Sequence, residues 1–213
     1  MIVKHNPELE HLLDAHSILA LHDDWTEEWH GAPPPVLPAE NFAAAVRAQH
    51  AANFELWHLE DQARVPQASD ARIAEVKRGI DGVNQRRNDL VERCDALLLE
   101  ALEPHGLPVP DSPLHSETPG LIVDRLSILA LKIFHTREET LRTDAPGGHV
   151  ARNRERLKLL AEQRDDLAGC LGELWSQVIR GQRRFKLYRQ LKMYNDPSLN
   201  PAVYQGAAGN TRG

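Results

Sequence analysis

Apolar residues recur every three or four positions through most of the chain, and the intervals between these stretches are rich in proline and glycine. This period places apolar side chains on one face of an α-helix, whereas a half-buried strand needs strict alternation, which the sequence never sustains for long. A segment such as HGAPPPVLPAEN, residues 30–41, cannot continue a helix because its prolines lack an amide hydrogen. The pattern therefore predicts an all-α fold.

The proline and glycine clusters divide the chain into an up-and-down bundle of about five long helices. We expect these helices over residues 7–30, 40–65, 70–103, 119–142 and 150–181. Thr118 is expected to cap the fourth helix, with Pro119 at its first position, where a missing amide hydrogen costs nothing. We expect one domain over residues 1–204, long enough to fold without disulfides, and a disordered tail over residues 205–213.

Charge and cysteine content narrow the class of protein. The net charge of −6 makes nucleic-acid binding an unfavoured function. Cys94 and Cys170 both fall on apolar helical stripes, so we expect two core residues of a cytoplasmic protein rather than a redox pair. The longest apolar run, LSILALKIF, is broken by Lys132, so we expect neither a signal peptide nor a membrane span.

The stretch NFELWHLEDQAR, residues 53–64, combines aromatic and ionisable side chains on one side of its helix. At about 100° per residue, Phe54 and Trp57 share an arc with His58, Asp61 and Arg64. Large aromatic rings are seldom exposed, so we expect these ionisable groups to be partly desolvated and paired. His58 and Asp61 are therefore predicted to supply acid–base chemistry, and an internal ion-pair lattice is the alternative.

Polar edges on the neighbouring helices extend this prediction. Guanidinium groups bind phosphate and carboxylate groups through two parallel hydrogen bonds, so basic residues around a cavity predict an anionic small molecule as the ligand, without a cofactor. The alternative is that each arginine pairs with a neighbouring acid. The predicted ligand-binding residues are Asn53, Arg64, Lys77, Asp81, Asn84, Arg87, Asn88, Asp124, Arg125, Lys132, His135, Tyr188, Lys192, Asn195 and Asp196.

The last four of these residues belong to a basic and aromatic segment, RGQRRFKLYRQLKMYNDP, residues 180–197. We expect this segment to bind a phosphate-bearing ligand or the acidic face of a partner protein, with charge at a helix C-terminus as the alternative. The overlapping YNDPSLNP is expected either to cover the pocket or to form an ordinary turn. A protein that only binds and stabilises a partner enzyme is therefore a second functional hypothesis.

Three Glu-x-x-His pairs make a metal site one of the hypotheses, because this spacing places both side chains on one side of a helix. They are Glu8/His11, Glu27/His30 and Glu55/His58. Three pairs exceed chance spacing only modestly, so we assign no metal ligand among the site residues. A metalloprotein that uses Glu55 and His58 is retained as a third hypothesis.

Several stretches, taken in order, resemble a known family. They are NFELWHLEDQAR, KRGIDGVNQRRNDLVE, SETPGLIVDRLSILALKIFH, EQRDDL and YRQLKMYNDPSLNP. Together they resemble an uncharacterised bacterial all-helical family, domain of unknown function family 4254, over about residues 40–204. The resemblance implies a cytoplasmic protein linked to cell-envelope polysaccharide or glycosyl-transfer pathways, so the expected anion is phosphorylated or nucleotide-sugar-like. It implies no particular reaction, and we further expect the chain to form homo-oligomers.

Overall fold

The computed structural model describes residues 7–36, 38–189, 198–199 and 201. Within them the chain forms one short helix, five long helices and one 3-10 turn, and the predicted all-α bundle is confirmed. The elements are α1 (Pro7–Leu12), α2 (Ala15–Gly31), α3 (Phe42–Gln62), α4 (Asp70–Leu102), the 3-10 turn Glu103–His105, α5 (Pro119–Leu141) and α6 (His149–Ile179).

Local capping chemistry sets the helix boundaries. The single helix expected over residues 7–30 is two helices, because Asp14 adopts an extended backbone and its carboxylate accepts a hydrogen bond from the Ser17 amide at 2.7 Å. An uninterrupted apolar period does not reveal such a break. Thr118 caps α5 as predicted, accepting from the Leu121 amide at 3.3 Å with Pro119 at the first helical position.

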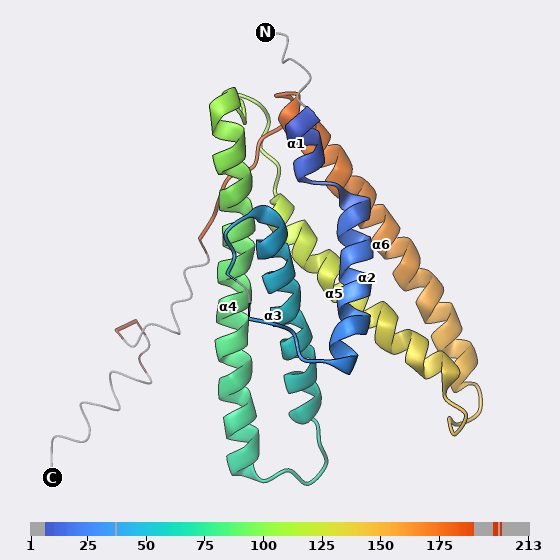
Figure 1. Cartoon of the computed structure of the whole chain (residues 1–213). Coiled ribbons are helices and arrows are strands. Elements are labelled where there is room, and N and C mark those ends of the chain that lie inside the picture. Colours follow the sequence, from blue (N-terminus) through green and yellow to red (C-terminus); the bar gives the residue numbers. More distant parts are fainter. Residues whose placement is uncertain (1–6, 37, 190–197, 200, 202–213) are drawn as a thin grey trace, which may run out of the picture.

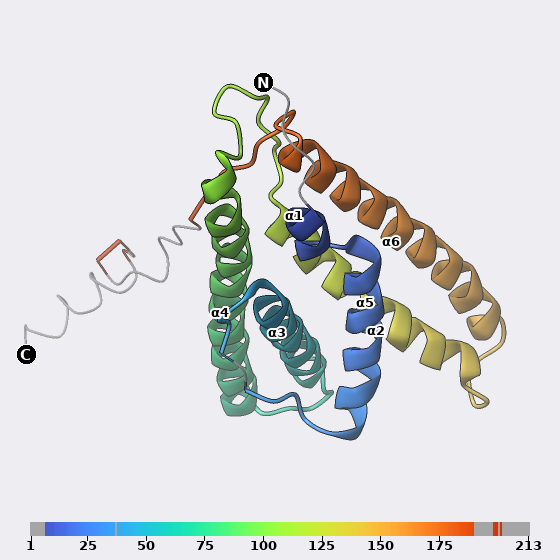
Figure 2. The same cartoon turned by 45° about the horizontal axis from the view of Figure 1, so that its top comes forward.

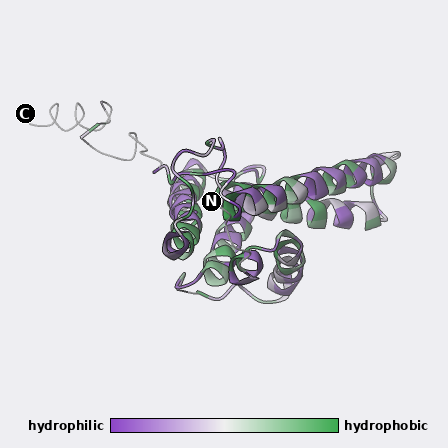
Figure 3. Cartoon of the chain, turned by 90° about the horizontal axis from the view of Figure 1, so that it is seen from above, coloured by the Kyte–Doolittle hydropathy of each residue, from purple (hydrophilic) through white to green (hydrophobic). Residues whose placement is uncertain are grey.

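The long helices form two hairpins, α3 with α4 and α5 with α6, and α2 packs against α5 (Figures 1 and 2). Seen from above, each helix carries both polar and apolar residues (Figure 3), as expected for helices that bury one face. Within the described residues, no helix combines the length and apolar character needed to cross a membrane.

The main apolar core joins all six helices at the end of the bundle where α1 lies. Trp175 of α6 holds α1 there by donating from Nε1 to the Leu9 carbonyl at 2.7 Å. Cys94 is fully buried in this core, whereas Cys170 is exposed, so the expectation for the second cysteine was wrong. Cys170 precedes the buried Leu171 by one position, which turns it about 100° away from the core.

The start of α5 lies unusually close to α4. A Cβ atom on Gly120 would meet the Val91 carbonyl oxygen at 2.7 Å, so this approach requires glycine. The buried Asp95 carboxylate accepts from the Gly120 amide at 2.7 Å, and burial raises the pKa of Asp95 to about 6. This contact fixes the position of α5, which carries several of the predicted site residues.

Candidate functional site

Helices α2, α3 and α5 meet through residues that recur every four positions on each helix. From the inside outward, the three layers are His22, His50 and Ser127, then Thr26, Phe54 and Leu131, then His30, His58 and His135. The three helices meet again eight residues further along each of them, at His30, His58 and His135. These helices therefore run in the same direction. At about 1.5 Å of rise per residue, the two histidine-containing layers lie about 12 Å apart.

In the inner layer, both ring nitrogens of His50 are hydrogen-bonded. The Thr26 hydroxyl donates to the His22 carbonyl at 2.7 Å, so it can only accept from His50 Nε2, which lies 3.0 Å away. His50 Nδ1 is then unprotonated and accepts from the Ser127 hydroxyl at 2.7 Å. Burial keeps the ring neutral, lowering the pKa of His50 well below its ordinary value.

Asn53 and Arg87 connect this layer to Asp124. Asn53 Nδ2 donates to Ser127 Oγ at 2.9 Å and to Asp124 Oδ1 at 3.0 Å. Arg87 donates from Nε and Nη2 to the two oxygens of the buried Asp124 carboxylate, at 3.0 and 2.9 Å, so these two charges neutralise each other. We define the buried polar network as Thr26, Gln49, His50, Asn53, Arg87, Asp124 and Ser127.

His22 completes the inner layer without joining that network. Its ring stacks on the His50 ring with centroids 4.6 Å apart, and its side chain is fully buried. Neither ring nitrogen has a hydrogen-bond partner among the described residues. Burial lowers the pKa of His22 to about 3, so the ring is neutral at physiological pH. The inner layer is therefore closed to solvent.

An apolar layer separates the two histidine layers. Phe54 and Leu131 form a small buried cluster with Trp29. Thr26 crosses this layer, because its hydroxyl contacts His50 while its backbone carbonyl accepts from His30 Nδ1 at 2.6 Å. The inner and outer histidines are thus connected by hydrogen bonds on α2 although their rings do not touch.

The outer layer is a three-histidine cluster, defined as His30, His58 and His135. One ring nitrogen of each histidine lies within 4.8 Å of the corresponding nitrogens of the other two. His30 and His58 each bond through Nδ1 to the backbone carbonyl four residues earlier, at 2.6 and 2.8 Å. His135 Nδ1 contacts the Glu138 carboxylate at 2.8 Å. Since all three Nδ1 atoms face acceptors, each neutral ring carries its proton there and keeps a lone pair on Nε2.

The surroundings hold these rings in place. Ring centroids lie 4.1 Å apart for His30 and Phe134, and 4.8 Å apart for His135 and Trp57. His135 Nε2 is buried and has no hydrogen-bond partner among the described residues, and burial lowers the pKa of His135. A neutral imidazole whose other nitrogen bonds to a carbonyl or carboxylate is the arrangement found in metal-binding histidines.

Sequence reasoning identified only part of this cluster. His58 and His135 were predicted as site residues, but His30 was noted only through its spacing from Glu27. Glu55, the expected metal partner of His58, instead pairs with Arg86 on α4. A side chain three positions away on a helix points about 60° to one side, and here that difference directs it to another neighbour. Nothing local in the sequence indicates that three separate helices bring these imidazoles together.

A hollow of about 380 Å³ lies between α3, α4 and α5, and we call it the α3/α4 hollow. The predicted residues Asn53, Asp61, Arg64 and Arg87 all line it. Asp61 and Arg64 are exposed, contrary to their expected desolvation, because they lie at the C-terminal end of α3 where the chain turns toward α4. Arg64 pairs with Glu60 at 2.9 Å, so both arginines of this hollow already have carboxylate partners.

The other predicted cations do not surround this hollow. Lys77 pairs with Asp81 at 2.8 Å on the exposed side of α4. Arg125 Nη1 donates to both oxygens of Glu117, at 2.8 and 2.9 Å. Arg125 and Lys132 line a groove of about 750 Å³ between α5 and α6, which we call the Arg125 groove.

The remaining predicted residues have structural or peripheral positions. Asn84 accepts from Arg87 Nη1 at 3.3 Å, and Asn88 is buried on α4. Tyr188 is exposed after α6. The predicted residues Lys192, Asn195 and Asp196, and with them the possible cover over the pocket, lie outside the described residues.

The described part of the basic segment is anchored to the loop before α5. The Arg184 amide donates to the Pro113 carbonyl at 3.1 Å, and the Arg184 carbonyl accepts from the His115 amide at 2.8 Å. Arg184 Nε also donates to the Ser112 carbonyl at 2.7 Å, and the next residue, Phe185, is buried. This arginine therefore connects two parts of the fold.

Comparison with known proteins places the chain in a family but assigns no activity. No curated protein and no solved structure matches it significantly. A family model described as a protein of unknown function (DUF4254) matches residues 43–187, which include His58 and His135 but not His30. This region covers more than half of the 213 residues. The chain therefore belongs to the DUF4254 family of proteins of unknown function.

Proposed function

We propose that this protein binds a divalent transition-metal ion through the three-histidine cluster. The observation that carries the proposal is the convergence of His30, His58 and His135, each with Nδ1 bonded to an oxygen acceptor and Nε2 left to coordinate. Metal-bound histidines commonly donate their second nitrogen to a carbonyl or carboxylate, which fixes the tautomer and the ring orientation. The aromatic rings beside them limit ring rotation before any ion arrives.

The donor set favours certain ions and one kind of site. Imidazole suits zinc, copper, iron and nickel, whereas calcium and magnesium prefer oxygen ligands. Three histidines leave one position of a tetrahedral zinc ion for water or substrate, as in catalytic rather than structural zinc sites. His30 is exposed, so the cluster lies at the edge of the helices where an ion can reach it from solvent. The ring nitrogens lie within 4.8 Å of one another, which brings all three near a single ion held at the usual zinc–nitrogen distance of about 2.0–2.1 Å.

Isothermal titration of the chelator-treated protein with zinc at pH 7.5 tests this proposal. We expect one ion per chain in the wild type and an affinity at least about 100-fold weaker in His135→Gln, because changes behind a ligand alone cost 10–100-fold. His16→Gln is the matched control, since His16 is an exposed residue of α2 outside the cluster. Equal zinc affinity in His135→Gln and His16→Gln would overturn the proposal.

A second candidate function is the binding of a phosphorylated or nucleotide-sugar-like anion in the α3/α4 hollow. Asn53, Asp61, Arg64 and Arg87 line this one hollow, which supports the proposal. The pairing of both arginines with carboxylates weakens it, because an anion must compete with Asp124 and Glu60. The test is the rise in melting temperature that a nucleotide sugar causes. A rise that persists in Arg64→Gln would exclude this hollow as the binding site.

The remaining expectations stay predictions. They are the link to polysaccharide pathways, the single domain over residues 1–204, homo-oligomers, and a partner protein held by the basic segment. Arg184 has a structural role, so a test of the partner hypothesis should neutralise Lys186 and Arg189, which are exposed. If a partner binds through this segment, its capture by the purified full chain should fall in a Lys186→Gln, Arg189→Gln variant.

A further inference from the structure

The outward face of α5 borders three hollows that share lining residues. Ile128, Lys132 and His135 lie three or four positions apart and therefore on one face of the helix. Lys132 and His135 line a third hollow of about 490 Å³, which we call the Arg156 hollow. Lys132 also lines the Arg125 groove, and Trp57 is shared between the Arg156 hollow and the α3/α4 hollow.

The cations around these hollows differ in whether an acid already neutralises them. Arg64, Arg87 and Arg125 each contact a carboxylate. Among the described residues, no carboxylate forms an ion pair with Lys132, and Arg156 donates only to the neutral side-chain oxygen of Asn153, at 3.0 Å. The two uncompensated cations therefore line the same hollow.

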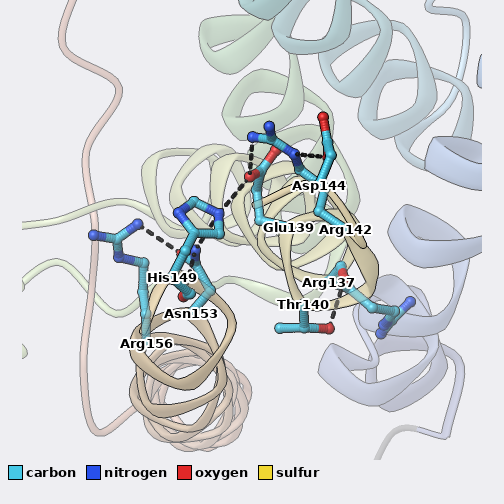
Figure 4. A network of polar contacts seen from close by, with 8 residues as sticks. All are labelled: Arg137, Glu139, Thr140, Arg142, Asp144, His149, Asn153 and Arg156. Atoms are coloured by element: carbon cyan, nitrogen blue, oxygen red, sulfur yellow. Dashed lines mark hydrogen bonds and ion pairs between the residues drawn. The ribbon is translucent and has the colours of Figure 1, made fainter. Parts of the chain in front are cut away.

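The acid in this hollow is already engaged. Figure 4 shows Glu139 between Arg142 and His149, with contacts of 3.0 and 2.6 Å, while Arg156 points to Asn153 on the other side of His149. Hydrogen bonds from Arg142 and then His149 lower the pKa of Glu139, so it is ionised and balanced by its own partner. The hollow thus keeps a net positive charge from Lys132 and Arg156.

The same hollow borders the three-histidine cluster. His135 belongs to both, and the Trp57 indole, nearly parallel to the His135 ring at 7°, forms another wall. A volume of about 490 Å³ lies within the usual 300–1,000 Å³ of small-molecule sites. Cationic groups and an indole ring in one lining suit a ligand with an anionic head and a planar or apolar body.

We infer that the Arg156 hollow binds the phosphate group of a small phosphomonoester between Lys132 and Arg156, beside the three-histidine cluster. A guanidinium group matches two phosphate oxygens, and an ammonium group supplies a point charge. The ligand's body then lies against Trp57. The inference rests on and deepens the proposed function, because it assigns a ligand class to the space beside the single metal ion that the histidines are proposed to hold. The charge argument itself needs no metal.

Calorimetric titration of the full chain with inorganic phosphate and with phenyl phosphate tests this inference in zinc-loaded and zinc-free protein. Compared with the wild type, we expect about tenfold weaker binding of both ligands in Lys132→Gln and in Arg156→Gln. Trp57→Leu should weaken the binding of phenyl phosphate more than the binding of inorganic phosphate. Lys158→Gln is the matched control, because Lys158 lies on the same helix as Arg156 but pairs with Glu155 at 2.8 Å.

The outcomes separate this inference from the metal proposal. Zinc binding without phosphate binding in either form of the protein overturns the anion site and leaves the metal site intact. Phosphate binding to zinc-free protein that Lys132→Gln and Arg156→Gln weaken supports the anion site even if zinc does not bind. Equal losses in Lys158→Gln and Lys132→Gln would show only a general charge effect and would overturn the inference.

Discussion

The inner and outer histidine layers differ sharply although they lie on the same three helices, eight residues apart. In the inner layer, both nitrogens of His50 are bonded and the His22 side chain is fully enclosed. In the outer layer, each histidine is bonded through one nitrogen, and His30 is exposed. His50 is fully hydrogen-bonded and His22 is sealed from solvent, so neither can take up a ligand, whereas the outer histidines each keep one nitrogen for binding.

The position of each layer along the bundle explains the difference. Trp25 and Trp29 of α2 lie against His50, so aromatic rings enclose the inner layer. His30 is in the last turn of α2, one residue before the helix ends at Gly31. Beyond that point no further turn of α2 covers the rings of His58 and His135. The same arrangement of helices therefore produces a closed layer inside and an accessible one at its edge.

The largest expected effect comes from breaking the buried polar network. Asp124→Ala leaves Arg87 half-buried without its counter-charge, and we expect a loss of about 3 kcal/mol in the free energy of unfolding. Urea unfolding at pH 7.5 measures it. Removing both charges in Arg87→Met, Asp124→Leu should recover part of the loss, because the unpaired charge is then absent while the Gln49 and Asn53 amides still lack an acceptor. A loss below about 1 kcal/mol in Asp124→Ala would contradict the closed character of this network.

A slightly smaller effect should come from metal binding to the outer layer. Zinc at 100 times its dissociation constant should raise the free energy of unfolding by about 2.7 kcal/mol, because it binds the folded state. His135→Gln should show no such response. His22→Phe, an inner-layer change, should keep the full response, and its loss there would mean that the two layers do not act separately.

Acidification should affect the inner layer through His22 and His50, and a comparison with His22→Phe measures the part that depends on His22. The pKa of His22 is 6.5 in the unfolded chain and about 3 in the fold, so the unfolded state binds the proton first as the pH falls. The contribution of the neutral His22 ring to the free energy of unfolding is complete above pH 6.5 and is progressively lost below that value. The measurement is the change in the free energy of unfolding between pH 7.5 and pH 5. We expect the wild type to lose about 2 kcal/mol more than His22→Phe over this range.

Asp95 also titrates in this pH range, and its effect on stability must be separated from that of His22. The pKa of Asp95 is raised to about 6, so its contribution to the free energy of unfolding is complete below pH 3.8 and is lost as the pH rises through 6. This dependence on pH has the opposite sign to that of His22. Asp95 is unchanged between the wild type and His22→Phe, so its contribution cancels from the comparison. Identical pH profiles for the two proteins would show that His22 titrates normally.

The smallest effect is expected at the exposed rim of the α3/α4 hollow. Glu60→Ala removes the carboxylate beside Arg64, and because both side chains are exposed, the free energy of unfolding should change by less than about 0.5 kcal/mol. The same urea measurement applies. A loss comparable to that of Asp124→Ala would mean that this exposed pair carries as much stability as the buried one.

Much of the fold was predictable because helix boundaries depend on near neighbours in the sequence. Thr118 and Pro119 start α5 as expected, since a cap acts within one turn. The break at Asp14 was missed because the apolar period continues through it. His58 and Asp61 share one side of α3 as the helical period requires, yet one is half-buried and the other exposed. Their environments depend on α2 and α5, which the local sequence does not describe.

The amino-acid sequence by itself determined the secondary structure, the apolar faces and the supply of imidazole and guanidinium groups, because these follow from backbone geometry and residue chemistry within a few positions. Tertiary structure decided which groups meet. It joined Arg87 to Asp124 across 37 positions and brought His30, His58 and His135 together from three helices. Whether a polar group is neutralised or left able to bind depends on contacts between distant segments, and only the packed helices define those contacts.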